Sequence, residues 1–81
     1  MTGLEHVSPL EALRFAKGLS QIEAAKQIGI TVRALRGLEH GEHEPVGETI
    51  YKLARFYEIG PAELLNEVRD WRGGRRTQAA A

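Results

Sequence analysis

Apolar side chains recur at helical spacing along most of this chain and predict a series of short helices. The sharpest signals lie in residues 20–41. Ser20 and Glu23 form a capping-box pattern that predicts a helix start, and Gly29 predicts the left-handed end of that helix. Thr31 is a suitable cap for a second helix. The inward faces of the two helices are expected to carry Ala24, Ala25, Ile28, Leu35 and Leu38.

Three more helices are predicted before and after this pair. Ser8 followed by Pro9 is typical of a helix start, and Gly18 is expected to end that helix. Glu48 opens the next predicted helix, and Pro61 begins the last one. The apolar positions of these helices are Leu10, Leu13, Ala16, Ile50, Leu53, Ala54, Tyr57, Leu64, Leu65, Val68 and Trp71, with Phe56 near an edge.

The 81 residues suffice for one small domain. Residues 1–8 carry no periodic pattern and are expected to form a loosely ordered lead-in, whereas the glycines and arginines of residues 72–81 predict a flexible basic tail. We therefore expect an all-α fold. A single domain spanning residues 1–81 would form a compact bundle of about five short helices, with its core at about residues 9–71.

The helix pair in residues 20–41 fits the description of a helix-turn-helix, whose second helix enters the DNA major groove. From about residue 10 to residue 65 the sequence also resembles the Cro/lambda-repressor type of helix-turn-helix, often called Xre-like. The matching residues, in order, are Gly18-Leu19-Ser20-Gln21, Ala25, Gly29-Ile30-Thr31, Leu35, Leu38-Glu39-His40-Gly41, Pro45, Thr49 and Lys52-Leu53-Ala54. The resemblance implies a lambda-repressor-like DNA-binding domain.

The predicted recognition helix offers few polar side chains for reading bases. Arg33 is the strongest candidate because its planar fork matches guanine O6 and N7, and Val32 suits a thymine methyl group. Arg36 lies on the exposed flank and is a candidate for phosphate or base contact. The resemblance implies base reading at the positions of Val32, Arg33 and Gly37, and proximity to phosphate at Ala34.

The resemblance also assigns roles outside these positions. Gln21 matches a Gln that bonds phosphate and buttresses the recognition helix, and His40 stands where the family often has a phosphate-contacting Asn. An ion pair between Arg14 and Glu39 is implied as well, although without the resemblance both residues would be read as solvated charges. The predicted DNA-contacting set is Gln21, Thr31, Val32, Arg33, Ala34, Arg36, Gly37 and His40.

Three residues depart from the family pattern. Phe15 and Ile22 are apolar where the family usually has polar side chains, and Ala24 is small where a Leu is more common. We expect Phe15 or Ile22 to fill the volume that Ala24 leaves open. The alternative is an exposed apolar patch for a partner.

Charge gives the DNA-binding hypothesis no direct support. Lys and Arg number 11 and Asp and Glu number 11, so the net charge is zero, and total charge argues neither way. Glu42 and Glu44 lie in a loop where relatives often carry basic residues, and they are expected to repel phosphate. Arg72, Arg75 and Arg76 in the tail are candidates to compensate.

Other classes of chemistry lack a motif. With no Cys, the chain has neither a disulfide nor a thiolate zinc site, and the His and Glu residues of 39–44 lie in a turn and not one helical turn apart. No nucleophile triad and no glycine-rich phosphate loop is present, so we expect neither an enzyme nor a cofactor. Apolar runs are too short to span a membrane, and a cytoplasmic location is expected.

The resulting interpretation is a sequence-specific DNA-binding transcriptional regulator. We expect a phage or bacterial repressor, Cro-like or an immunity repressor, that occupies an operator in double-stranded DNA as a homodimer. The operator would be an inverted repeat. One alternative is an antitoxin that autoregulates its operon and binds a toxin through the C-terminal helix and tail, and another is a protein-interaction domain that has lost DNA binding. The expected dimer interface is Leu64, Leu65, Val68 and Trp71.

Overall fold

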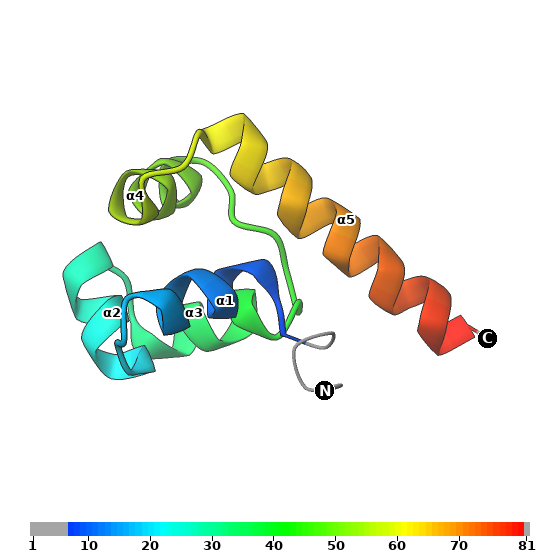
Figure 1. Ribbon diagram of the computed structural model, residues 1–81, viewed down its shortest axis with the longest axis horizontal. Coiled ribbons are helices and arrows are strands. Elements are labelled where there is room, and N and C mark those ends of the chain that lie inside the picture. The colour runs from blue at the N-terminus through cyan, green and yellow to red at the C-terminus, as the bar shows by residue number, and fades with distance from the viewer. Residues whose placement is uncertain (1–6, 81) are drawn as a thin grey trace.

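The computed structural model describes residues 7–80, with side chains described as far as Gly74. The predicted lead-in therefore falls largely outside the described residues. Helices account for the regular structure of the described part, which contains no strand, so the predicted all-α fold is confirmed. The helices are α1 (Pro9–Ala16), α2 (Gln21–Ile28), α3 (Val32–Glu39), α4 (Glu48–Tyr57) and α5 (Pro61–Ala80) (Figure 1).

Short polar side chains begin the first three helices as the sequence predicts. At α2 the Ser20 hydroxyl accepts from the Glu23 N–H at 3.1 Å, and the Glu23 carboxylate accepts from the Ser20 N–H at 2.9 Å. Hydrogen bonding of the charged Glu23 carboxylate to Ser20, first to its backbone N–H and then to its side chain, lowers the pKa of Glu23. Ser8 and Glu11 form the same reciprocal pair at α1. At α3 the Thr31 hydroxyl accepts from the Ala34 N–H at 3.0 Å, so each start is fixed by local chemistry.

Left-handed residues end α2 and α4. Gly29, with φ of 95°, ends α2 and lets the chain turn directly into α3. At the end of α4 the left-handed position is occupied by Glu58, with φ of 58°, and not by Gly60. The backbone of any residue with a Cβ is strained in this conformation, so Glu58 adds a local energetic cost to the α4–α5 turn.

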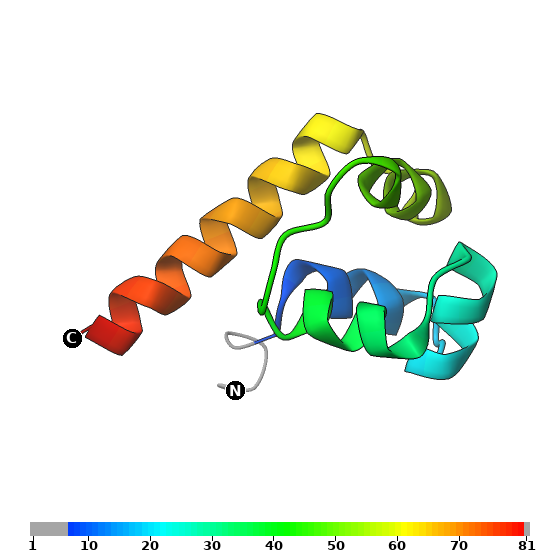
Figure 2. The same ribbon diagram turned by 180° about the vertical axis from the view of Figure 1, so that it is seen from behind.

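The core lies where the five helices converge. Helices α1, α2 and α3 form one layer, α4 lies over it, and α5 runs diagonally along the side (Figures 1 and 2). The first half of α5 packs against this body through Leu64 and Val68, and its C-terminal half projects beyond the other helices. The buried apolar residues are Leu10, Ala24, Ala25, Ile28, Leu35, Leu38, Ile50, Leu53, Ala54, Tyr57, Leu64 and Val68.

Two predictions about the periphery are wrong. Residues 72–81 were predicted to form a flexible tail, but α5 continues through Gly73 and Gly74 to Ala80. Two glycines cost a helix only about 2 kcal/mol together, and Arg72 anchors this part of α5 by donating to the Gly41 carbonyl at 3.2 Å.

The second error concerns the volume beside Ala24. Ala24 is fully buried, yet Phe15 is 53% and Ile22 is 65% exposed, so neither fills the core there. Arg14 faces inward, and a helix rotates by about 100° per residue, which turns Phe15 outward. The alternative, an exposed apolar side chain at each position, is what the structure contains.

Candidate nucleic-acid interface

Helix α3 has one buried face and one outward stripe. Leu35 and Leu38 are buried in the core, which fixes the rotation of the helix. On the opposite side Arg33, Arg36 and His40 are exposed at spacings of three and four residues. The α2–Gly29–α3 unit therefore has helix-turn-helix geometry, with a stripe of basic side chains on its second helix.

A buried ion pair links α1 to the end of α3. The Glu39 carboxylate accepts from Arg14 Nε at 2.8 Å and from Arg14 Nη2 at 3.0 Å, and the two side chains are 0% and 9% exposed. Arg14 Nη1 also donates to the Leu19 carbonyl at 3.0 Å, at the entry to α2. The hydrogen bond with Glu39 raises the pKa of Arg14 further above its ordinary value. The expected pair is thus present and joins three segments.

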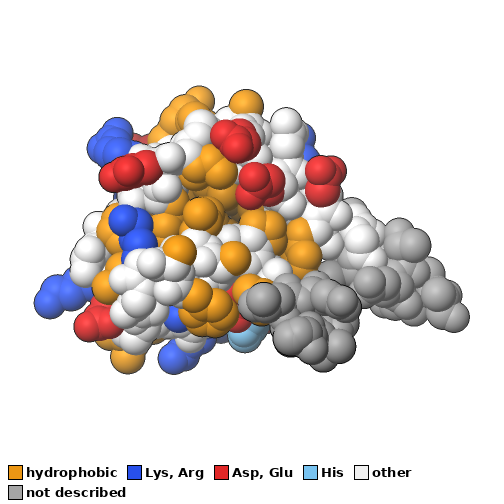
Figure 3. Space-filling view, viewed as in Figure 1, with side chains coloured by type: hydrophobic (Ala, Val, Ile, Leu, Met, Phe, Trp, Pro, Cys, Tyr) orange, Lys and Arg blue, Asp and Glu red, His pale blue; other side chains and the backbone are white. Residues whose placement is uncertain are grey.

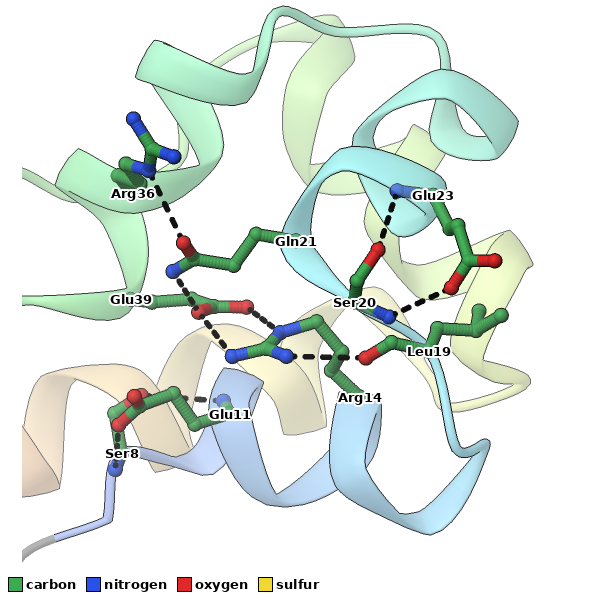
Figure 4. A network of polar contacts seen from close by, with 9 residues as sticks. All are labelled: Ser8, Glu11, Arg14, Leu19, Ser20, Gln21, Glu23, Arg36 and Glu39. Atoms are coloured by element: carbon green, nitrogen blue, oxygen red, sulfur yellow. Dashed lines mark hydrogen bonds and ion pairs between the residues drawn. The ribbon is translucent and has the colours of Figure 1, made fainter.

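Gln21 carries this network out to the surface of α3. Its Nε2 donates to Glu39 Oε1 at 2.9 Å, and its Oε1 accepts from Arg36 Nε at 3.1 Å (Figure 4). The charges at its two ends fix which way the amide points, because only the amide nitrogen can donate to a carboxylate. Arg36 is therefore held in place by a chain of bonds that begins in the core. The structure thus contains the support of α3 by Gln21 that the resemblance implies, and the contact of Gln21 with phosphate stays a prediction.

Gly37 lies on the outward side of α3 but is covered by the loop that follows the helix. A Cβ placed on Gly37 would lie 2.6 Å from His43 Cε1 and 3.3 Å from Glu42 Oε1. Gly37 itself is buried and His43 is exposed, so the molecular surface at this position is formed by the imidazole. Base reading at the position of Gly37 stays a prediction, and the side chain that lies at this position is that of His43.

The acidic loop is tied to α5. Arg69 Nε and Arg72 Nη1 each lie 3.3 Å from a carboxylate oxygen of Glu44, and Arg72 Nε donates to the Gly41 carbonyl. Glu44 is thus paired and does not present a free charge. Of the tail arginines expected to offset the loop, Arg72 does so directly, and the side chains of residues 75–81 lie outside the described ones.

Comparison with known proteins decides the family. A family model described as helix-turn-helix matches residues 10–64. The chain belongs to the Cro/lambda-repressor-type helix-turn-helix family. It is also 37% identical over 60 residues to the cryptic phage CTXphi transcriptional repressor RstR of Vibrio cholerae. That match covers 74% of this chain and 54% of RstR, so the chain spans about half of that relative's length. No solved structure matches the chain.

The remaining predicted contact residues of this helix-turn-helix domain differ in accessibility. Arg33 is exposed and points away from the core side of α3, whereas Val32 and Ala34 are half-buried. Thr31 is exposed, but its hydroxyl caps α3. The exposed His40 has further interactions within the fold.

The residues of the expected dimer interface, Leu64, Leu65, Val68 and Trp71, differ in how far they are buried. Leu64 is 0% and Val68 is 1% exposed, so both belong to the core of the helix-turn-helix domain and are unavailable to a partner. Leu65 and Trp71 remain half-buried. The prediction that Leu64 and Val68 lie in a dimer interface is therefore wrong, because this face of α5 packs against the core of its own domain.

None of the helices in the described part of the chain combines the length and apolar character that a membrane span needs. Within the same residues no three His, Cys, Asp or Glu side chains are grouped as a metal site would require. Glu39 lies in the core and pairs with Arg14, whereas Glu44 lies in the loop and pairs with Arg69 and Arg72.

Proposed function

We propose that this domain binds operator DNA sequence-specifically and represses transcription. The observation that carries the proposal is the outward stripe of α3, on which Arg36 is held by Gln21 while Arg33 is exposed. Membership of the helix-turn-helix family and the likeness to a phage transcriptional repressor support the same function. It would act in the cytoplasm by occupying its operator, with no enzymatic step.

In the proposed complex α3 lies in the major groove. Arg33 donates through its planar fork to guanine O6 and N7, and Val32 contacts a thymine methyl group. The free amides at the start of α2, next to Gln21, face phosphate. Figure 3 supports this placement, because acidic side chains gather at the upper edge while Lys and Arg project mostly from the left and lower edges, where α2 and α3 lie in Figure 1.

We further propose that two copies bind an inverted repeat. Paired half-sites lie about 34 Å apart on one side of the duplex, and a single small module buries too little surface for tight specific binding. With Leu64 and Val68 in the core, the contact between copies would use the half-buried Leu65 and Trp71 and the projecting end of α5.

The test is selection from a randomised duplex library at about 50 and 200 mM salt. Enrichment of an inverted repeat that is bound more weakly at the higher salt concentration supports the proposal. Arg33→Ala should then lose about 1–3 kcal/mol of discrimination at one base pair of each half-site. Arg55→Ala removes an exposed arginine from α4 and serves as the matched control, with unchanged sequence preference. Failure of a folded sample to enrich any sequence refutes the proposed function.

A second candidate function is supported by the shape of α5. Its C-terminal half projects beyond the body, as an arm that binds another protein would (Figure 2). An autoregulating antitoxin would use this arm for its toxin, and a domain that has lost DNA binding would use it alone. Selection from the duplex library distinguishes these two alternatives, since an antitoxin would still select an operator sequence and a domain that has lost DNA binding would not.

A further inference from the structure

The recognition surface of α3 has a gap at Gly37 that another segment fills. Gly37 follows Arg33 by four residues and therefore lies on the same side of the helix, one turn further along. It carries no side chain of its own. His43 covers it, with Cε1 2.6 Å and Nδ1 3.3 Å from the place a Cβ would occupy. The imidazole thus lies where a side chain from position 37 would leave the helix.

The close approach requires glycine. A separation of 2.6 Å is shorter than real Cβ contacts, so any other residue at position 37 would push the imidazole away. The backbone of Gly37 is helical and needs no left-handed conformation, so backbone freedom does not account for the choice of residue. The imidazole therefore occupies the space that a side chain at position 37 would take.

The loop that carries His43 is held at several points. The Glu42 N–H donates to the Gly37 carbonyl at 2.9 Å, which fixes the start of the loop on α3 itself. Arg72 donates to the Gly41 carbonyl, and Glu44 pairs with Arg69 and Arg72 of α5. His43 therefore lies between two anchored residues, as preorganised contact groups do.

We propose that His43 is a specificity-determining residue that reads a base edge from the position over Gly37. The inference rests on the proposed function, since it needs α3 in the major groove. An imidazole N–H donates to the N7 or O6 acceptors of a purine. Gly37, which His43 covers, lies four residues or about 6 Å along α3 from Arg33, and this rise corresponds to roughly two base pairs when α3 follows the groove. The reading surface then combines a helix and a loop.

The experiment compares dissociation constants of the full chain for the duplex selected by the wild type and for every single-base-pair variant of it. The wild type, Arg33→Ala and His43→Ala are measured on the same set. His43→Ala is expected to lose about tenfold discrimination at one base pair, roughly two pairs from the position that depends on Arg33. Discrimination at the Arg33-dependent pair should stay unchanged. Val46→Ala, at an exposed residue of the same loop, is the control.

Gly37→Ala gives an independent test, because the added methyl group displaces His43 without removing it. It should lose the same discrimination as His43→Ala. If His43→Ala lowers the melting temperature, Gly37→Ala replaces it as the variant expected to lose the discrimination. His43→Gln, which keeps an N–H donor at similar size, should then retain more of the discrimination than Gly37→Ala.

Three results would overturn the inference: a uniform loss of affinity on all duplexes, which marks a phosphate contact or loop support; no change in any preference; or the same change in Val46→Ala. If the wild type selects no sequence at all, the proposed function fails before His43 is tested.

Discussion

The ion pair between Arg14 and Glu39 gives the sharpest prediction about stability. Replacing Arg14 by Met keeps an unbranched apolar stem but removes three hydrogen bonds, two to Glu39 at 2.8 and 3.0 Å and one to the Leu19 carbonyl at 3.0 Å. The Glu39 side chain is 0% exposed and, among the residues that the structure describes, would keep the Gln21 amide as its donor. An uncompensated buried charge of this kind costs about 3–5 kcal/mol.

The assay is urea unfolding at constant pH for a double-mutant cycle. We expect Arg14→Met to lower the free energy of unfolding by about 3–5 kcal/mol, enough to unfold much of a small domain at room temperature. Arg14→Met combined with Glu39→Met leaves no buried charge and should recover most of the loss. Lys26→Met, on the exposed side of α2, is the control for a surface charge and should change stability by less than about 0.5 kcal/mol.

Two results would refute the reasoning. A cost below about 1 kcal/mol for Arg14→Met would mean that water reaches Glu39 and that the pair behaves like a surface salt bridge. If Arg14→Met and its combination with Glu39→Met are equally stable, the stability lost in Arg14→Met comes from packing and not from the pairing of charges.

Other predictions concern single residues around α4. Tyr57→Phe should leave stability unchanged or raise it by up to about 1 kcal/mol, because the buried Tyr57 hydroxyl has no hydrogen-bond partner within the described part of the structure; urea unfolding at pH 7 measures this. Burial raises the pKa of Tyr57 to about 12, so the wild type should lose stability progressively as pH rises from about 10, where tyrosine ionises in the unfolded chain, to about 12. A wild type and a Tyr57→Phe variant that lose stability equally over this range would contradict the assignment. Glu58→Gly should raise the free energy of unfolding by about 1 kcal/mol, since φ of 58° suits glycine, and a decrease would show that the Glu58 side chain stabilises the turn. Gly47→Ala should destabilise by about 1–3 kcal/mol in thermal unfolding, because φ of 52° with ψ of −130° is unfavourable for a residue with a Cβ, and a neutral result would indicate that the start of α4 can rearrange.

Features fixed by neighbouring residues could be predicted from the sequence. The capping pair Ser20 and Glu23 and the left-handed Gly29 depend on chemistry within four residues, and the structure contains both as expected. The ion pair of Arg14 with Glu39 spans 25 residues and was reached through the family resemblance, because no local pattern pairs two distant charges.

Features that depend on how the elements pack could not be predicted. Whether Phe15 fills a gap beside Ala24 depends on the rotation of α1, which is set by Arg14 in the core. The cover over Gly37 depends on the path of a loop anchored by Arg72, which is 31 residues away from its acceptor Gly41. A glycine on the outward stripe of a recognition helix is a signal in the sequence, but it does not identify the side chain that covers it.

Because α5 anchors the loop, the folded unit extends beyond the stretch of sequence that the family model matches. The family match stops at residue 64, before Val68 closes the core and before Arg69 and Arg72 reach Glu44. A fragment that ends at residue 64 would keep the whole helix-turn-helix but lose the part of α5 whose arginines anchor the adjacent loop. Two relatives with the same recognition helix but different last helices could then prefer different DNA sequences. Comparing such proteins by their recognition helices alone would leave that difference without an explanation.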